Sequence, residues 1–248
     1  MSETAIIVQA RSGSTRLPNK MTIPFFEGQS ILEIIIKRLS ERYRTILATT
    51  NHEDDQVLVN LVAKFNSVSI YRGSEHNVLE RFIKTAEFYN IDTIIRVCAD
   101  NPFINVQMID SLLKLYNGED YCSYMYSNGK PTILGHLGLF CEITSINTLK
   151  KVNRLTKEMK YQEHVTNFIY TNPNIFNVKL HRLPADIRSY EGIRLTIDTQ
   201  RDFDLVKEIY KKFGGRQTTE DVEKMIQYIS SNNVILQTMA VEIKNNSK

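Results

Sequence analysis

The sequence predicts an α/β fold, a three-layer sandwich in which a mainly parallel central sheet lies between two layers of helices. Short apolar runs alternate with amphipathic segments through the first half of the chain. This alternation predicts parallel strands joined by right-handed crossover helices. The chain has 248 residues, of which 42% are hydrophobic, so it is long enough for one domain with a substantial core.

Four apolar runs in the first half predict the strands of this sheet. The first covers residues 5–8, and the others cover residues 45–48, 68–71 and 93–97. Their length and their polar flanks are typical of buried strands. In a parallel sheet the carboxyl ends of the strands meet at one edge, and ligands of such folds bind there.

Polar residues that can cap a helix precede the amphipathic segments. Ser30 and Glu33 have the spacing of a capping box, and Asn77 with Glu80 can cap a helix in the same way. Asn51 is expected to cap the helix between them. The apolar residues at helical spacing, which include those of a fourth helix, are Ile31, Leu32, Ile34, Ile35, Leu39, Val57, Leu58, Leu61, Val62, Phe65, Val78, Leu79, Phe82, Ile83, Ala86, Val106, Ile109, Leu112 and Leu113.

The second half is less regular. Apolar runs predict strands over residues 120–125, 137–143, 176–181 and 193–197, with a loop at 129–131. One helix is expected to end before Pro173, with its buried face formed by Tyr161, Val165, Phe168 and Ile169.

Two further capping boxes predict the last two helices. They are formed by Thr199 with Asp202 and by Thr218 with Asp221. The first of these helices is expected to end at Gly214. The chain after Val241 is polar and is expected to fray.

We expect a single domain over residues 1–248. Its regular first half covers residues 1–118. A smaller β-rich region covers residues 119–213, and a C-terminal helix with a tail covers residues 214–248.

Composition excludes several other classes of protein. A net charge of +3 is too small to predict a nucleic-acid or membrane partner. Cys98, Cys122 and Cys141 are scattered, which disfavours a zinc site or a disulfide framework. No apolar run approaches a membrane span and no signal peptide is expected, so we expect a cytoplasmic protein.

The segment after the first strand carries the main functional signal. It contains small hydroxyl residues, Gly13 and the three cations Arg11, Arg16 and Lys20. Backbone N–H groups near a glycine can surround phosphate oxygens, while nearby cations neutralise the charge. The spacing matches neither a P-loop nor a dinucleotide-binding fingerprint.

Two aspartates follow apolar runs that lie far apart in the sequence. Asp100 follows residues 94–99 and Asp198 follows residues 193–197. Individually, Asp100 is explained as a turn residue and Asp198 as an acid at a helix start. Placed together at one sheet edge beside a cationic loop, they favour a Mg²⁺ site. Cations and Mg²⁺ held by carboxylates are what phosphoryl or nucleotidyl transfer requires.

Residues 10–20, ARSGSTRLPNK, resemble the signature loop of the cytidylyltransferases that activate sialic acid-type and 3-deoxy-manno-octulosonate sugars. Within that superfamily the chain is most similar to the spore coat polysaccharide biosynthesis protein F group. The loop is supported by companion segments in the same order at residues 72–75, 78–81, 95–97, 100–102, 163–166 and 195–199. Where the group often has Gly-Asp-Cys-Pro, this chain has Ala99-Asp100-Asn101-Pro102, a departure expected to alter the acceptor side.

The resemblance implies a nucleotidyltransferase fold and an enzyme that uses CTP and Mg²⁺ to form a nucleotide sugar for surface polysaccharide biosynthesis. It assigns catalysis to Arg11, Lys20, Asp100 and Asp198, and the metal to the two aspartates. It also implies a homodimer and a single nucleotidyltransferase domain, in which residues 1–118 form the nucleotide-binding half and residues 119–213 form the acceptor and dimerisation half. The nucleotide-binding residues that it implies are Ala10, Arg11, Ser12, Gly13, Ser14, Arg16, Lys20, Thr49, Arg72, Gly73, Ser74 and Asp100.

The acceptor side is less defined. Its candidate residues are Glu142, His164, Arg188, Tyr190 and Arg194, each of which is also explained by packing or surface charge. The acceptor itself stays open between sugars, sugar acids, polyol phosphates and phosphonates. Two other functions stay open as well, a glycosyltransferase of related fold and a non-catalytic nucleotide-binding protein. The former predicts a D-x-D motif, and Asp100-Asn101-Pro102 does not match it.

Overall fold

The computed structural model describes residues 3–183, 192–214 and 218–246. Its centre is a seven-stranded sheet with the order β5-β4-β1-β6-β8-β7-β9. Only β8 among the described strands of this sheet is antiparallel to its neighbours, which confirms the predicted mainly parallel sheet. The strands are β1 (Thr4–Gln9), β4 (Thr45–Thr50), β5 (Val68–Gly73), β6 (Thr93–Cys98), β7 (Tyr121–Met125), β8 (Glu142–Ser145) and β9 (Val178–Arg182).

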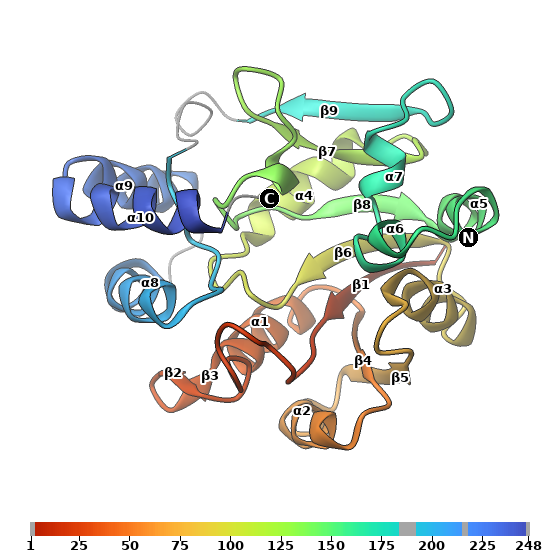
Figure 1. Ribbon diagram of the computed structural model, residues 1–248, viewed down its shortest axis with the longest axis horizontal. Coiled ribbons are helices and arrows are strands. Elements are labelled where there is room, and N and C mark those ends of the chain that lie inside the picture. The colour runs from red at the N-terminus through yellow and green to blue at the C-terminus, as the bar shows by residue number, and fades with distance from the viewer. Residues whose placement is uncertain (1–2, 184–191, 215–217, 247–248) are drawn as a thin grey trace.

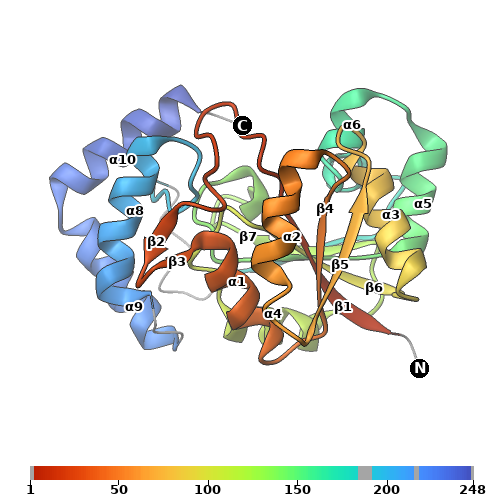
Figure 2. The same cartoon turned by 90° about the horizontal axis from the view of Figure 1, so that it is seen from below.

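Helices cover both faces of this sheet (Figures 1 and 2). Alternate residues of β1 pack into two different clusters: Ile6 and Val8 face one layer, and Ala5 and Ile7 face the other. The first layer contains α1 (Ile31–Ser40), α2 (Gln56–Val62), α4 (Val106–Leu115), α8 (Gln200–Phe213), α9 (Thr219–Ser230) and α10 (Asn233–Asn245). The second contains α3 (Val78–Phe88), α5 (Ile146–Leu155), α6 (Met159–Glu163) and α7 (Asn167–Tyr170).

The predicted helix starts at Ser30, Asn77, Thr199 and Thr218 are confirmed. The three predicted capping boxes have both reciprocal hydrogen bonds, and Asn77 accepts a hydrogen bond from the Glu80 amide. The prediction for Asn51 is wrong, because His52 caps a short 3-10 turn, η1 (Glu53–Asp55), that precedes α2. A small hairpin of β2 (Pro24–Phe26) and β3 (Gln29–Ser30) precedes α1, and the sequence pattern does not predict it.

Two predicted strands of the second half are wrong in whole or in part. Residues 137–141 precede β8 without strand pairing, after the short turn η2 (Thr132–Leu134). Residues 193–197 are buried but form no ladder. Their amides donate instead to the carbonyls of His136 and Asp100, which belong to two different loops. Residues 193–197 therefore have an apolar pattern because they are buried, although they do not pair with a strand.

The predicted helix around Tyr161 is two short helices. The break between α6 and α7 lies at His164, Val165 and Thr166. Thr166 Oγ1 donates to the buried Glu142 carboxylate at 2.6 Å. This bond holds the break against β8.

The predicted frayed tail after Val241 is wrong for the described residues of that segment, because α10 continues to Asn245. Asn246 accepts a hydrogen bond from Arg16, and Glu242 accepts one from Thr199. Figure 2 shows the end of α10 beside the loop that follows β1. The C-terminal helix thus reaches the carboxyl edge of the sheet.

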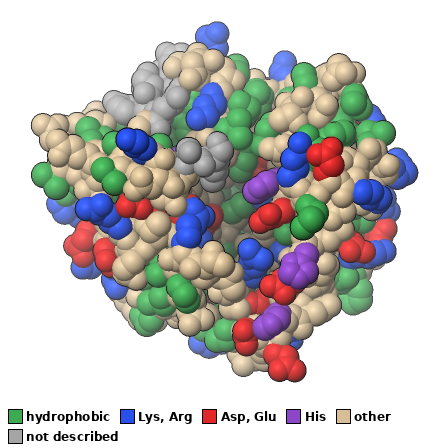
Figure 3. Space-filling view, in the orientation of Figure 1, with side chains coloured by type: hydrophobic (Ala, Val, Ile, Leu, Met, Phe, Trp, Pro, Cys, Tyr) green, Lys and Arg blue, Asp and Glu red, His purple; other side chains and the backbone are tan. Residues whose placement is uncertain are grey.

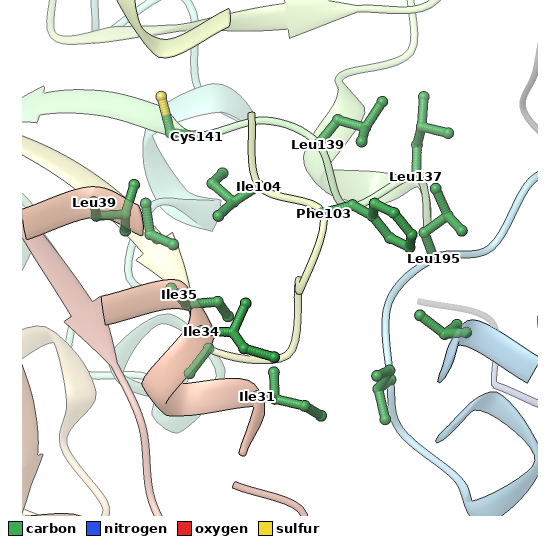
Figure 4. Packing of buried hydrophobic residues seen from close by; sticks show 14 of the residues in the cluster. Ile31, Ile34, Ile35, Leu39, Phe103, Ile104, Leu137, Leu139, Cys141 and Leu195 are labelled. Carbon is green, nitrogen blue, oxygen red and sulfur yellow. The ribbon is translucent and has the colours of Figure 1, made fainter. Parts of the chain in front are cut away.

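The loop after β6 is fixed by the apolar core. Phe103 and Ile104 are buried, and Figure 4 shows Ile104 toward Leu39 of α1, and Phe103 toward Leu137 and Leu195. Because these residues follow Asp100 closely, their packing fixes the position of that carboxylate at the sheet edge.

Candidate active site

The carboxyl ends of β1, β4, β5 and β6 meet at one edge of the sheet, as the parallel pairing requires. Figure 3 shows acidic, basic and histidine side chains gathered around a hollow in this face of the molecule. The residues that line the hollow come from the opening loop, which we define as residues 10–20, from the end of β1 and from the end of β6 with the residues after it.

Asp55 fixes the opening loop to the end of β4. Ser12 donates to Asp55 Oδ1 at 2.6 Å from both its amide and its hydroxyl. Asp55 Oδ2 accepts from Thr49 Oγ1 at 3.1 Å and also from the amide and hydroxyl of Thr50. Burial by itself raises the pKa of Asp55, but these hydrogen bonds outweigh it and lower the pKa. Asp55 is therefore a buried anion that holds the loop.

Lys20 joins the opening loop to both predicted metal-binding aspartates. Its Nζ lies 3.6 Å from Asp198 Oδ1 and 3.9 Å from Asp100 Oδ2. It also donates to the Ile197 carbonyl at 2.8 Å. The Lys20 side chain is 11% exposed, so its ammonium lies where electrostatic interactions are strong. The structure therefore brings these three residues together as the sequence predicts.

Arg16 also contacts this group. It forms an ion pair with Asp198 Oδ1 at 2.8 Å, and its other terminal nitrogen donates to Asn246. Half of the Arg16 side chain is exposed, so it can turn toward a phosphate. Arg11 is exposed and lines the cleft beside the loop.

Arg194 is not at the acceptor side, so its predicted role is corrected. Its side chain has no exposed surface. It donates to both oxygens of Asp202, to Asp198 at 3.0 Å, and it contacts His136 Nδ1 at 2.6 Å. The guanidinium therefore holds Asp198 from the interior, since burial in a charge network leaves it no contact with an acceptor.

Other predicted nucleotide-binding residues have structural partners. Arg72 donates to the carbonyls of Thr50 and His52 and to Gln56, which turns it toward the loop after β4. Thr49 is buried on Asp55. A Cβ at Gly73 would lie 3.0 Å from the Tyr71 ring and 3.1 Å from Arg81 Cγ, so the close packing favours glycine there.

The remaining nucleotide-binding candidates lie in or beside the loops. Ser14 donates from its amide to the Ser12 carbonyl, and its hydroxyl accepts from the Leu17 amide. Ser74 accepts from Arg81 and Asn77. Ala10 is buried, and Gly13 is exposed.

Glu142 is buried and lies opposite Arg96 in the β6–β8 pair. It forms an ion pair with Arg96 and accepts from Tyr121 Oη at 2.8 Å and from Thr166. Both residues line a cleft, but the Glu142 oxygens are occupied. His164 is exposed at the end of α6. Arg188 and Tyr190 lie outside the described residues.

Three clefts open on this edge. The phosphate cleft encloses about 700 Å³ and is lined by the opening loop with Gln9, Cys98 and Asp100. The α3–α6 cleft, about 640 Å³, shares Gln9 and Arg11 with it and contains Arg81 and Glu163. The β6–β8 cleft, about 420 Å³, meets the phosphate cleft at Cys98. The arrangement offers one binding region beside the cationic loop and another beyond Asp100.

Asp100 and Asp198 fit a divalent cation that also binds phosphate. No group of three or more potential ligands occurs in the part of the chain that the structure describes. Mg²⁺ commonly takes one or two carboxylates and leaves its other positions to water and phosphate. No helix among the described ranges is long and apolar enough to span a membrane.

Several residues of this edge were missed by the sequence interpretation. Asp55 belongs to an acidic run after a strand end, and Arg96 interrupts an apolar strand. Those signals mark unusual residues but do not identify their partners. Arg81 is 1% exposed, and burial lowers its pKa to about 10. Only the fold shows that Arg81 and Arg11 share a cleft.

Comparisons with known proteins cover nearly the whole chain. A model of the family described as cytidylyltransferase matches residues 5–244. The chain is 38% identical over 231 residues to an uncharacterised protein of Methanocaldococcus jannaschii, covering 91% of this chain and 90% of that protein. It is 34% identical over 226 residues to the spore coat polysaccharide biosynthesis protein SpsF of Bacillus subtilis, covering 87% and 90% respectively.

A solved structure is also similar in fold. The cytidylyltransferase from Leptospira borgpetersenii matches with a TM-score of 0.81 and 27% identity, covering 96% of this chain and 98% of that one. The similarity in sequence and in structure therefore spans both halves of the fold.

Proposed function

This chain belongs to the cytidylyltransferase family, and from this premise we propose that it transfers CMP from CTP to an oxygen of a small-molecule acceptor and releases pyrophosphate. The product serves surface polysaccharide or glycoconjugate biosynthesis. The observation that carries the proposal is the position of Lys20, buried at the end of the opening loop and within 3.9 Å of both Asp100 and Asp198.

The triphosphate binds in the phosphate cleft. Arg11 and Arg16 lie at its exposed rim and Lys20 at its base, so charge of the opposite sign surrounds the phosphates. Asp55 keeps the backbone of the opening loop in place through Ser12. The nucleoside extends toward the α3–α6 cleft, which shares Gln9 and Arg11 with the phosphate cleft.

Asp100 and Asp198 would hold Mg²⁺. When bound, Mg²⁺ neutralises phosphate charge and orients the oxygens of the triphosphate. Arg194 keeps Asp198 in position from the buried side. Arg16 leaves Asp198 for a phosphate oxygen, which its exposure permits.

The transfer is an in-line displacement at the α-phosphorus. The acceptor oxygen forms a bond to phosphorus, the bond between the α-phosphorus and the bridging oxygen breaks, and pyrophosphate leaves with the electron pair. A hydroxyl acceptor loses its proton to water, whereas an anionic oxygen has none to lose. Lys20 stabilises the charge that develops on the phosphate oxygens.

Pyrophosphate release tests this function directly. The four ribonucleoside triphosphates are assayed with Mg²⁺ and candidate sugars, sugar acids, polyol phosphates and phosphonates. We expect release with CTP and one acceptor class, and at least roughly 100-fold lower kcat/KM in Asp100→Asn and Asp198→Asn. Asp204→Asn, an exposed carboxylate on α8, is the control. If no pair of nucleotide and acceptor releases pyrophosphate, the proposed activity is wrong. Normal rates in both aspartate variants would overturn the metal assignment.

The proposal includes a cytoplasmic homodimer that involves the second half of the chain near Glu163. Met159, in the same short helix, is 81% exposed, and exposed apolar side chains favour protein contacts. Sedimentation at several concentrations tests the dimer. A monomer at all concentrations would overturn it.

A further inference from the structure

The β6–β8 cleft contains buried polar atoms that lack partners. Asn101 Oδ1, Thr196 Oγ1 and Arg96 Nε are all buried without a hydrogen bond from the described chain. All three residues line this cleft. Unpaired buried polar atoms are uncommon in proteins, so their concentration in one cleft marks a place where a bound molecule supplies the partners.

The cleft adjoins the reacting phosphate of the proposed transfer. Asn101 directly follows Asp100, and Thr196 lies two residues before Asp198. Cys98 lines both this cleft and the phosphate cleft. A molecule in the β6–β8 cleft can therefore extend past Cys98 toward Asp100, which lines the phosphate cleft.

The three unpaired atoms differ in what they require. Asn101 Oδ1 only accepts hydrogen bonds, Arg96 Nε only donates them, and Thr196 Oγ1 does both. Neighbouring hydroxyl groups satisfy all three, because each hydroxyl donates and accepts. A carboxylate or ionised phosphonate only accepts hydrogen bonds, so it satisfies Arg96 Nε and the Thr196 hydroxyl but places its lone pairs against those of Asn101 Oδ1.

The charges of the cleft lead to the same conclusion. Among the described residues that line it, the charged ones are Arg96 and Glu142, and they form an ion pair with each other. An additional carboxylate would lose its water beside Glu142 without gaining a free cation, which is unfavourable.

We infer that the β6–β8 cleft binds an uncharged, polyhydroxylated part of the acceptor, a sugar ring or an alditol chain, and that Asn101 and Thr196 select it over a sugar acid. This inference rests on the proposed function. The acceptor's reacting oxygen lies at the Asp100 end and its hydroxyl-rich part lies along Asn101, Thr196 and Arg96. Asn101 is one of the two residues, with Ala99, at which this chain departs from the Gly-Asp-Cys-Pro pattern.

Matched ligands test this selection by binding as well as by turnover. D-Glucitol 6-phosphate and 6-phospho-D-gluconate differ only in that one end is a hydroxymethyl group or a carboxylate. 3-Deoxy-manno-octulosonate is a second acidic probe. Dissociation constants are measured by ligand-observed NMR on the full chain with Mg²⁺ and a non-hydrolysable CTP analogue, and pyrophosphate release is followed with CTP.

We expect the glucitol phosphate to bind at least tenfold more tightly than either acid. Asn101→Leu and Thr196→Val should each weaken the binding of glucitol phosphate at least fivefold and reduce its preference over the acids. The affinity for the CTP analogue should change less than twofold. Asn60→Leu, at an exposed position of α2, should change none of these constants. Melting temperatures identify a variant that fails to fold, and the binding constants of the other variant then test the inference.

Equal or tighter binding of either acid overturns the inference, as does failure of all three probes to bind. An unchanged preference in both folded variants also overturns it. The proposed transfer fails differently, since it would give no pyrophosphate from CTP with any acceptor even where the binding preference holds.

Discussion

Ser12 donates two hydrogen bonds to Asp55, one from its amide and one from its hydroxyl, each 2.6 Å long. The two residues come from different strand ends, and Thr49 and Thr50 complete the set of donors around the same carboxylate. The loop that carries the cations is thus held by a buried anion.

Asp55→Asn should destabilise the protein and loosen the opening loop. The amide of asparagine keeps one acceptor oxygen but presents its NH₂ group to donors. We expect the free energy of unfolding to fall by about 2–3 kcal/mol and KM for CTP to rise roughly tenfold. Urea denaturation and steady-state kinetics measure the two effects.

The matched control is Asp54→Asn, because Asp54 is the exposed neighbour of Asp55. Its free energy of unfolding should change by less than about 0.5 kcal/mol. Equal stability of the two variants would contradict the role of Asp55 as the buried anchor.

The stabilising effect of Asp55 should depend on pH. Its pKa is lower in the folded chain than in the unfolded chain, so its contribution is present above the unfolded value, about 3.9, and is lost as the pH falls through the folded value. The stability difference between wild type and Asp55→Asn should therefore be constant from pH 7 to 5 and shrink toward pH 3. A stability difference that grows on acidification would contradict a lowered pKa of Asp55 in the folded chain.

Local patterns predicted those parts of the fold that depend on residues close in sequence. The capping box at Ser30 needs only Glu33, three residues later, and its spacing is visible in any sequence. The same holds for Asn77 and Thr199. The position of Asp100 after the carboxyl end of β6 followed from the parallel topology, which a repeated pattern specifies. Asp198 lies near Lys20 as predicted, but it follows a segment that forms no strand.

Partners that are distant in sequence could not be predicted. The apolar residues 193–197 are buried as predicted, but burial does not specify a ladder, and their amides bind loops far away in the chain. In the sequence alone, Arg194 is indistinguishable from a surface cation. Only the fold shows that Asp202, Asp198 and His136 surround it. Likewise, the polar residues after Val241 continue α10, and their partners Arg16 and Thr199 lie far away in the sequence.

Arg194→Met should be strongly destabilising, because it removes the cation that pairs with the buried Asp202 and one of the three cations around Asp198. We expect a loss of about 3–5 kcal/mol in the free energy of unfolding. Adding Asp202→Asn should cost less than the sum of the single changes, with a coupling above about 1 kcal/mol. Urea denaturation of the double-mutant cycle measures it.

Arg201→Met is the control for this cycle, since Arg201 is mostly exposed and lies in α8 beside Asp202. It should change stability by less than about 0.5 kcal/mol. Additive effects of Arg194 and Asp202 would show that the guanidinium does not hold that carboxylate.

Gly138→Ala should affect the acceptor more than the nucleotide. Gly138 has φ of +64°, and an added Cβ would lie 2.9 Å from Asn101 Oδ1 and 3.4 Å from Thr196 Cγ2. Gly129 has φ of +84° with nothing within 4 Å of its added Cβ, so Gly129→Ala reproduces the backbone strain alone. Both variants should lose about 1–2 kcal/mol of stability from a left-handed alanine. Only Gly138→Ala should raise KM for the acceptor, roughly tenfold, because it displaces Asn101. Kinetics at saturating CTP distinguish the two variants. Equal KM values for the acceptor in both would show that Asn101 does not contribute to acceptor binding.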